Sequence, residues 1–539
     1  MFMLIRSFDV NFNDLPDEIL LMIFQFLNYV DIVYSFYNLN DRFNRIIHDP
    51  VLTRCFKLVK KSCNHSYQNG TFSNMMLNRL CLEILPLIDD HIHEFILDSS
   101  SMQQILHATF YRNLAHLSLS DLRRETIEWL FTDEKLCRGV FRNQIQTLRI
   151  KLDDIDDEAT FCPISYICEN IFTVFHSLLS LELDESAPSI DFHHELSFED
   201  IRVDHFRCST LSKLKINVSS FEDCLHLFDG RFDQLQSVDI NVCRIRRSEL
   251  IPKQIDLPRM KHFFISCSCL TYYFEEEVLP LLHRMSNLEK LKMCFQIDLS
   301  RGFLDLNYFD RNILCSLPKL NQLSFFIHSN RLFPNEEELA ILETLEERFH
   351  VDPGVGIASY GEFFSEERTA QYHLYSSPSF NEYFCGISNR FPGGAFPYVR
   401  EVSLFDTKPF EEEFFRRIVQ SFPRMETLSV VNSKAENHEE DNQENVSAIQ
   451  YNHLVRLVLL HTHDHYIEQF LLERKSNLVQ KVSLFVKYQS FKRITDNFTR
   501  DQTRVNCSKV NHLYFPDYDH SDDLHKYFPY AKIDECIAL

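Results

Sequence analysis

Three histidines late in the sequence have the spacing that comes closest to a chemical site. His461, His463 and His465 occupy alternate positions, with Asp464 among them. In an extended segment all three imidazoles would share one face, a spacing that suits metal ligands. The same residues directly follow a strand-like apolar run, and turns at strand ends often hold solvated histidines. We therefore expect a solvent-exposed turn here and no metal.

The other residue types that could support chemistry form no recognisable constellation. The acidic run at 153–158 lacks the glycine and the twelfth-position glutamate of an EF-hand loop, so we interpret it as a solvated loop. Cys267 and Cys269 would share one side of a strand, but nothing nearby completes a ligand set. The sequence has no glycine-rich phosphate loop, nucleophile elbow or H-E-x-x-H motif. We expect no catalytic residue and no cofactor.

Composition and charge argue against several classes of protein. The 539 residues include 55 lysines and arginines against 78 acidic residues, which gives a net charge of −23. General nucleic-acid binding needs a basic surface, so we expect no nucleic-acid partner. The apolar start at 1–5 is cut short by Arg6, and no later run approaches a membrane span, so we expect no membrane partner. The 16 scattered cysteines fit reduced thiols in a cytoplasmic or nuclear protein.

Three short helices are expected near the N-terminus. The first would have Asp14 as its N-cap and Pro16 in its first turn; Asp31 would cap the second, and Asn40 or Asp41 the third. The apolar residues of the first helix recur at three- and four-residue steps and cover more than one stripe. They are Ile19, Leu20, Ile23, Phe24, Phe26 and Leu27. Helices this short cannot bury all of this surface among themselves, so part of it should face a partner.

This segment resembles the F-box. The resemblance lies in a leading Leu-Pro pair, an acidic residue and apolar residues in register, and in the third helix Phe43 stands where many F-boxes have tryptophan. It implies docking onto the adaptor subunit of an SCF-type ubiquitin ligase and, through it, onto the cullin scaffold. The adaptor-binding residues that it implies are Leu15, Pro16, Glu18, Ile19, Leu20, Ile23, Phe24, Leu27 and Asp31. The alternative is an ordinary three-helix cap packed on the next domain.

A short apolar pattern recurs along the rest of the chain. It reads apolar-x-x-apolar-x-apolar, and most copies lie about 22–33 residues apart, the period of leucine-rich repeats. Each copy alternates at its end, as a half-buried strand does. The fourteen copies begin at Ile92, Leu114, Ile145, Leu178, Leu211, Leu235, Met260, Leu288, Leu320, Val399, Met425, Leu454, Val479 and Val510.

Helical stretches separate many of these copies. Examples are 167–178, 274–285, 309–317, 411–422 and 466–475. A strand and a helix per unit, repeated in series, predict an α/β fold with a parallel inner sheet and outer helices. This arrangement resembles the leucine-rich-repeat horseshoe of F-box proteins. The predicted architecture is therefore an N-terminal three-helix F-box followed by a leucine-rich-repeat horseshoe.

The expected domains are an F-box at 12–48, a helical connector at 49–90 and a leucine-rich-repeat domain at 91–539. In the connector, an apolar helix at 75–85 is expected to end at Pro86.

An irregular insert at about 331–398 breaks the period of the repeats. It begins with an expected helix at 336–349 and is either an inserted loop or a set of irregular repeats. Long inserts are often functional, and this one could lie over the concave sheet face. A second polar stretch, 433–446, is interpreted as an acidic loop.

The concave sheet face is the expected target-binding surface. A basic stripe on an acidic protein suggests an acidic or phosphorylated ligand, and exposed phenylalanines suggest apolar anchors. Alternatively, the lysines are only solvated and the insert or a C-terminal lid covers the apolar half. The residues expected to bind the target are Arg149, Lys213, Lys215, Lys290, Lys292, Phe264, Phe326, Phe405 and Phe485.

The sequence thus predicts a non-catalytic substrate-recognition subunit of an SCF-type ubiquitin ligase. In this prediction the F-box docks the adaptor and the repeats bind an unidentified target protein. The alternative is a leucine-rich-repeat protein-binding scaffold that acts without ubiquitination.

Overall fold

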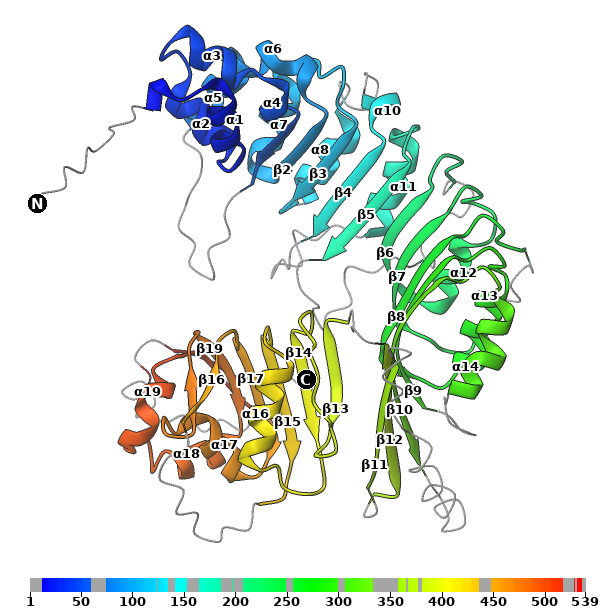
Figure 1. Ribbon diagram of the computed structural model, residues 1–539, viewed down its shortest axis with the longest axis vertical. Helices are drawn as coiled ribbons and strands as arrows, with labels where there is room; N and C mark the ends of the chain where they lie inside the picture. Colours follow the sequence, from blue (N-terminus) through cyan, green and yellow to red (C-terminus); the bar gives the residue numbers. More distant parts are fainter. Residues whose placement is uncertain are drawn as a thin grey trace, which may run out of the picture. The chain divides into compact units, whose positions relative to one another are not determined.

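Every copy of the recurring apolar pattern lies on a β-strand in the computed structural model (Figure 1). Most of these strands begin two residues after the first apolar residue of the copy, as β3 (His116–Ser120) does after Leu114. The expected strands are therefore confirmed at all fourteen positions, and the chain belongs to the α/β class.

The structure describes residues 12–59, 74–122, 124–133, 141–152, 164–185, 197, 207–248, 255–298, 306–332, 357–364, 367–376, 381–435, 447–516, 528 and 531–535. The chain divides into two compact units. The first comprises Met1–Ile265 and Glu275–Leu288, and the second comprises Ser266–Phe274 and Glu289–Leu539.

The largest sheet has twelve strands and is mostly parallel. Its first strand, β1, comes from the segment at 49–90 that was expected to be only helical. In sheet order the strands are β1 (Cys55–Leu58), β2 (Glu94–Asp98), β3, β4 (Thr147–Leu152), β5 (Ser180–Glu185), β6 (Lys213–Ser220), β7 (Ser237–Arg244), β8 (His262–Thr271), β9 (Lys290–Asp298), β10 (Gln322–Leu332), β12 (Thr369–Ser376) and β11 (Ile357–Phe364).

A repeated backbone contact joins each strand entrance of the first unit to the next. The carbonyl of Ala115 accepts hydrogen bonds from the amides of Gln146 and Thr147, at 2.8 and 3.0 Å. The carbonyl of Gln146 accepts in the same way from Leu179 and Ser180. Because one carbonyl accepts from two successive amides, the register of each strand relative to the strand before it is fixed.

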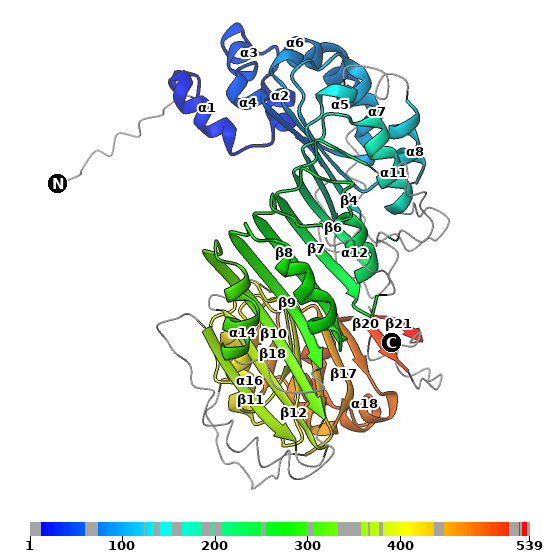
Figure 2. The ribbon, with the colours of Figure 1, turned by 90° about the vertical axis from the view of Figure 1, so that its right-hand side faces the viewer.

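Helices cover one face of these strands. Figure 2 shows α7 (Ser99–Ala108), α8 (Arg124–Thr132), α11 (Ile164–Val174) and α12 (Phe221–Leu227) on the same side. The apolar residues that point to this side are in register across the strands and are buried, among them Leu117, Leu148 and Leu181. We call the opposite side of β2 to β8 the open face, because its residues alternate with the buried ones and are exposed or half-buried.

Three further short helical elements lie between successive strands of the large sheet. They are α10 (Phe141–Gln144), the π-helical turn η7 (Phe274–Val278), with which the stretch expected at 274–285 begins, and α13 (Leu279–His283).

The N-terminal segment forms the short helices η1 (Phe12–Asp14), α1 (Asp17–Gln25), α2 (Tyr29–Phe36), α3 (Asp41–Ile47) and α4 (Pro50–Thr53). Their core is aromatic: the ring of Phe36 lies 5.0 Å from that of Phe24 and 5.2 Å from that of Phe43.

The helix caps of this segment differ in part from the expectation. Asn40 caps α3 as expected, and its side chain accepts from the amide of Phe43. Asp14 and Asp31 were wrong as caps: Pro16 precedes α1, and Asn28 caps α2 by accepting from the amide of Val30. An N-cap must sit just outside the helix, whereas Asp31 already lies in the first turn of α2.

The apolar helix expected to end at Pro86 continues beyond it. It consists of α5 (Asn74–Arg79), the π-helical turn η2 (Leu80–Ile84), α6 (Leu85–Ile88) and the 3-10 turn η3 (Asp89–His91). Pro86 falls in the first turn of α6, directly after the π-helical turn ends, a position at which proline is tolerated.

In the second unit, the irregular insert adds strands to the large sheet. β11 and β12 form an antiparallel hairpin, and β12 pairs antiparallel with β10. The preceding stretch expected to be helical, 309–317, contains α14 (Leu306–Asn312) and the 3-10 turn η8 (Leu314–Ser316). The helix expected at 336–349 lies outside the described residues, as do the runs 153–158 and 436–446.

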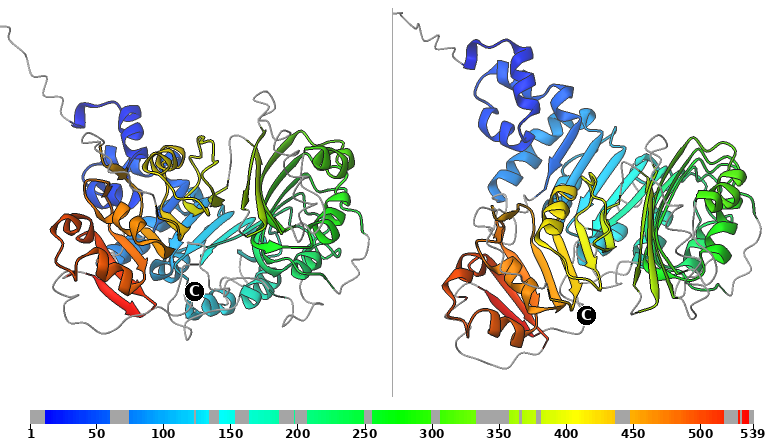
Figure 3. Two further views of the ribbon diagram at one scale, coloured as in Figure 1. Left: turned by 90° about the horizontal axis from the view of Figure 1, so that it is seen from below. Right: turned by 60° about the horizontal axis from the view of Figure 1, so that its bottom comes forward.

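A separate parallel sheet of seven strands completes the second unit (Figure 3). Its order is β13 (Tyr383–Ile387), β14 (Glu401–Phe405), β15 (Thr427–Asn432), β17 (Arg456–Thr462), β19 (Val482–Val486), β20 (Val510–Phe515) and β21 (Lys532–Glu535). The strands are connected through α16 (Glu412–Ser421), α17 (Asp464–Leu471), α18 (Tyr488–Ile494), η9 (Asp501–Thr503) and α19 (Arg504–Cys507). Two further strands, β16 (Ile449–Tyr451) and β18 (Ser476–Leu478), pair in parallel with each other and form a separate two-stranded sheet.

Replacement of a leucine on the helix-covered side should destabilise the first unit. We expect Leu148→Ala to lower the free energy of unfolding by about 2–5 kcal/mol, because the lost side chain is fully buried and leaves a cavity. Urea denaturation followed by circular dichroism measures the change. The matched control is Ser118→Ala on the open face of the neighbouring strand, which should change stability by less than about 0.5 kcal/mol. Equal effects of the two variants would contradict the assignment of faces.

Candidate functional site

An exposed apolar stripe runs along α1 and the residues just after it. Ile19, Met22, Phe26 and Leu27 are 41%, 57%, 88% and 51% exposed, respectively. Their spacing of three, seven and eight residues from Ile19 places them on one side of the helix. Four large apolar side chains in contact with water form a surface that a protein partner could cover.

The residues that the F-box resemblance implies differ in how far they are exposed to solvent. Pro16, Glu18, Ile19, Leu27 and Asp31 are exposed. Leu15 and Ile23 are half-buried.

Leu20 and Phe24 were wrong as surface contacts, because both are fully buried. Phe24 packs against the rings of Phe12 and Phe36 in the core of the helices. A side chain in that position holds the helices together and cannot reach a partner.

Met22 and Phe26 are the members of the stripe that are absent from the implied adaptor-binding residues, although Phe26 was among the apolar residues expected on this helix. Apolar residues occupy nearly all sides of the helix that the sequence predicts, so periodicity alone does not separate its core side from its exposed side. The only signal was their spacing from Ile19, and it becomes decisive once Leu20 and Phe24 are known to face inward.

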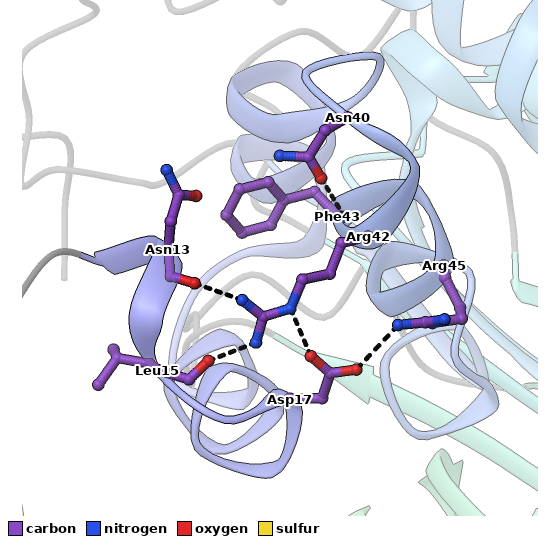
Figure 4. Close-up of polar contacts among 7 residues, drawn as sticks. All are labelled: Asn13, Leu15, Asp17, Asn40, Arg42, Phe43 and Arg45. Atoms are coloured by element: carbon purple, nitrogen blue, oxygen red, sulfur yellow. Dashed lines mark hydrogen bonds and ion pairs between the residues drawn. The ribbon is translucent and has the colours of Figure 1, made fainter.

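Arg42 of α3 fixes the turn that leads into α1 (Figure 4). Its guanidinium donates to the carbonyls of Asn13 and Leu15. Its Nε lies 2.6 Å from Oδ1 of Asp17, and Arg45 approaches the other carboxylate oxygen at 3.2 Å. The hydrogen bond from Arg42 holds the pKa of the Asp17 carboxyl below its ordinary value. One arginine thus connects the Leu15–Pro16 turn, the start of α1 and the third helix.

Two cations of the open face, Arg149 and Lys215, are paired with carboxylates from other strands of the sheet. Arg149 of β4 lies 3.0 Å from Glu182 of β5 and 3.7 Å from Glu94 of β2. Lys215 of β6 lies 3.4 Å from the same Glu182. Parallel pairing sets Arg149 opposite Glu182 and Glu182 opposite Lys215, so the charges alternate in sign. The expected basic stripe is therefore a mixed-charge ladder over these strands.

The remaining expected residues of the first unit are Lys213, which is exposed, and Phe264, which is half-buried. Glu94 and Glu182 were missed, although both occupy non-apolar positions of the recurring pattern and could have been found by aligning its copies.

In the second unit, Lys290 and Lys292 are exposed on β9, but two of the expected phenylalanine anchors are buried. Phe326 contacts Phe384 with ring centres 4.7 Å apart. Phe485 is stacked on Tyr514 at 4.2 Å and lies under the guanidinium of Arg456.

Phe405 is only half-buried and packs on Phe364, with ring centres 5.0 Å apart. The expectation of an exposed apolar half is wrong at Phe326 and Phe485, because other aromatic and cationic groups of this unit cover both rings.

The histidines at 461, 463 and 465 do not share one face. β17 ends at Thr462, and α17 begins at Asp464, so the extended segment assumed for them is absent. His463 is the N-cap of α17, where its ring accepts from the amide of His465. In the part of the chain that is described, no group of three or more histidine, cysteine or acidic side chains is placed to hold a metal ion.

No family model matches the sequence, and no curated protein matches it. Among the described residues, no helix combines the length and apolar character that crossing a bilayer requires.

Removal of the Arg42 side chain should loosen the turn before α1. We expect Arg42→Ala to raise amide hydrogen exchange across residues 13–20, because two carbonyls and one carboxylate lose their donor. The carboxylate part of this stabilisation is present above the ordinary pKa of 3.8 and disappears as the pH falls through the lowered pKa of Asp17. Hydrogen-exchange mass spectrometry at neutral pH measures the effect.

Arg45→Ala is the matched control, since Arg45 is more exposed and makes only one of these contacts. Identical exchange in the two variants would show that Arg42 does not fix the turn.

Proposed function

We propose that this protein is the substrate-recognition subunit of an SCF-type ubiquitin ligase. The observation that carries the proposal is the exposed stripe of Ile19, Met22, Phe26 and Leu27, which lies within the segment that resembles the F-box. Apolar side chains at this density in water favour a protein partner over permanent exposure. In this proposal the partner is the adaptor subunit, which connects the chain to the cullin scaffold.

The Arg42 contacts support this reading of the N-terminal helices. Docking by a few apolar side chains requires that they are already held in the binding geometry, since ordering them on binding costs free energy. Arg42 ties the Leu15–Pro16 turn to Asp17 and so holds the beginning of the stripe before any partner arrives.

The serial strands support a leucine-rich-repeat horseshoe as the target-binding part. Fourteen copies of one pattern, each on a strand and many followed by a helix, fit a repeat architecture whose open sheet face binds proteins. The ladder of Glu94, Arg149, Glu182 and Lys215 favours a target with both signs of charge over a purely acidic one.

In this role the chain carries out no bond chemistry. It raises the effective concentration of a target near the conjugating enzyme, which other subunits hold. In this role the protein acts in the cytoplasm or nucleus. The second candidate, a leucine-rich-repeat scaffold that acts without ubiquitination, shares the open face but needs no adaptor.

Co-purification of the adaptor with the full-length chain tests the proposal. We expect wild type to retain the adaptor and Met22→Glu/Phe26→Glu to bind at least about tenfold more weakly, about 1.4 kcal/mol, because each glutamate would be buried without a partner. Both side chains are exposed in the free chain, so the thermal midpoint should stay unchanged.

The matched control is Leu82→Glu/Leu87→Glu, which introduces the same charges at two exposed leucines outside the stripe. Retention of the adaptor by this control, with loss in the stripe variant, is the expected outcome. If wild type retains no adaptor, the scaffold without ubiquitination becomes the better proposal. If both variants lose it equally, the stripe is not the docking surface.

A further inference from the structure

Two histidines lie side by side in the interior of the second unit. The antiparallel register places His328 of β10 opposite His373 of β12, and His373 opposite Tyr360 of β11. The imidazoles of His328 and His373 are stacked with centres 4.4 Å apart, and the Tyr360 ring is stacked on His373 at 4.5 Å. All three side chains are more than nine-tenths buried. We call this row the histidine seam.

The segment 383–391 covers the seam. The backbone carbonyl of Cys385 accepts a 2.7 Å hydrogen bond from Nε2 of His373. The Phe384 ring lies 5.3 Å from the His373 ring. Gly386 has a φ of +65°, and a Cβ added there would lie 2.9 Å from the His328 ring, so only glycine permits this approach. The segment and the hairpin are therefore in tight contact through the two imidazoles.

The seam contains buried polar atoms that lack partners. Among the described residues, neither ring nitrogen of His328 has a hydrogen-bond partner, and the same is true of Nδ1 of His373. The hydroxyl of Tyr360 and the side-chain oxygen of Gln371 beside them are also unpaired. Buried polar groups are nearly always paired, so this concentration calls for a physical explanation.

The surrounding groups do not stabilise charged imidazoles. Glu362 of β11, whose carboxylate acts on Tyr360, lies 3.8 Å from Arg390 and 3.9 Å from Lys408. Burial raises the pKa of Glu362. Tyr375 of β12 and Cys385 of β13 act on the Tyr360 hydroxyl and raise its pKa further. The other titratable groups of the packed elements are Cys294 of β9 and Tyr383 of β13, which interact with each other, and Asp406 after β14, which acts on Glu362.

Both imidazoles are neutral in the closed seam. Burial lowers the pKa of His328 to about 4. Burial, and then the adjacent His328, also lower the pKa of His373 well below its ordinary range, while its bond to the Cys385 carbonyl opposes the shift. Protonation would place two like charges 4.4 Å apart and give Nδ1 of His373 a proton with no acceptor.

We propose that His328 and His373 form an acid-sensitive latch, whose protonation separates β10 and the β11–β12 hairpin from the segment 383–391. Above the ordinary pKa of 6.5 both histidines are neutral whether the seam is closed or open, and the latch stays closed. As the pH falls below 6.5, the open form takes up protons that the closed form cannot. Opening uncovers the rings of Phe326 and Phe384, which are otherwise buried against each other.

Hydrogen-exchange mass spectrometry of the full-length chain at pH 7.5 and pH 5.0 tests the latch. Each histidine should increase the opening constant by up to about tenfold per pH unit below 6.5. After correction for the intrinsic pH dependence of exchange, we expect protection of 383–391, the segment that loses its contacts with the hairpin, to fall at least tenfold. Protection of 370–376 should change less, because β12 stays paired with β10 and β11. Protection of β14 and β15 should change little.

Two variants separate the latch from general acid unfolding. His328→Phe keeps an aromatic ring in the stack but cannot take up a proton, so the pH effect on exchange should shrink. His461→Gln removes an exposed imidazole elsewhere in the second unit and should behave as wild type.

A measurement on the wild-type chain covers the case in which His328→Phe does not fold. Deuterium exchange at the imidazole C2 positions gives the pKa of each histidine separately. We expect slow exchange for both histidines, with the pKa of His328 near 4 and that of His373 well below its ordinary range. Titration of both near 6.5, unchanged protection of the seam at pH 5.0, or an equal loss of protection throughout the second unit would overturn the proposal.

Discussion

The structure depends on one backbone contact that is repeated from strand to strand. At the entrances of β1 to β7, a single carbonyl accepts the amides of two successive residues at the entrance of the next strand. In the first unit the accepting residues are Arg54, His93, Ala115, Gln146, Leu179, Ser212 and Gln236. Because the contact uses only main-chain atoms, it places little demand on residue type, and seven different surroundings support the same geometry.

This contact fixes the register, and the register decides what each side chain can touch. Once Leu117, Leu148 and Leu181 are level with one another, the alternation of the strand sends their neighbours to the open face. Arg149 then lies directly opposite Glu182, and Lys215 lies on the other side of Glu182. A slip by one residue would exchange the buried leucines for these charges, so the ion pairs and the apolar core specify the same arrangement.

Two regions depart from the usual rule that apolar groups are buried and polar groups are hydrated. The stripe of Met22 and Phe26 exposes apolar surface to water, while the seam of His328 and His373 hides polar atoms from it. Both arrangements cost free energy in the isolated chain. In the two proposals, a protein that covers the stripe would remove the first cost, and opening of the seam to water would remove the second.

The sequence by itself determined the strands at the fourteen copies of the pattern, because a short alternating apolar run repeated in series favours half-buried extended segments. It also located the aromatic and apolar helix at the N-terminus and narrowed the cap of the third helix to Asn40 or Asp41, of which the structure has Asn40. It did not show β1 or the strands β11, β12 and β13. It could not tell which side of α1 faces inward, because Leu20, Phe24, Met22 and Phe26 are all apolar and only the packing of α2 and α3 separates them.

Only the tertiary structure decided the remaining features. The pairing of Arg149 with Glu94 joins residues 55 positions apart, and the stacking of His328 on His373 joins residues 45 apart. Neither contact leaves a local pattern in the chain, since each arises from strand order and register. Local periodicity thus fixed the elements, whereas the neighbours of each side chain came from long-range pairing that the sequence does not encode in any one segment.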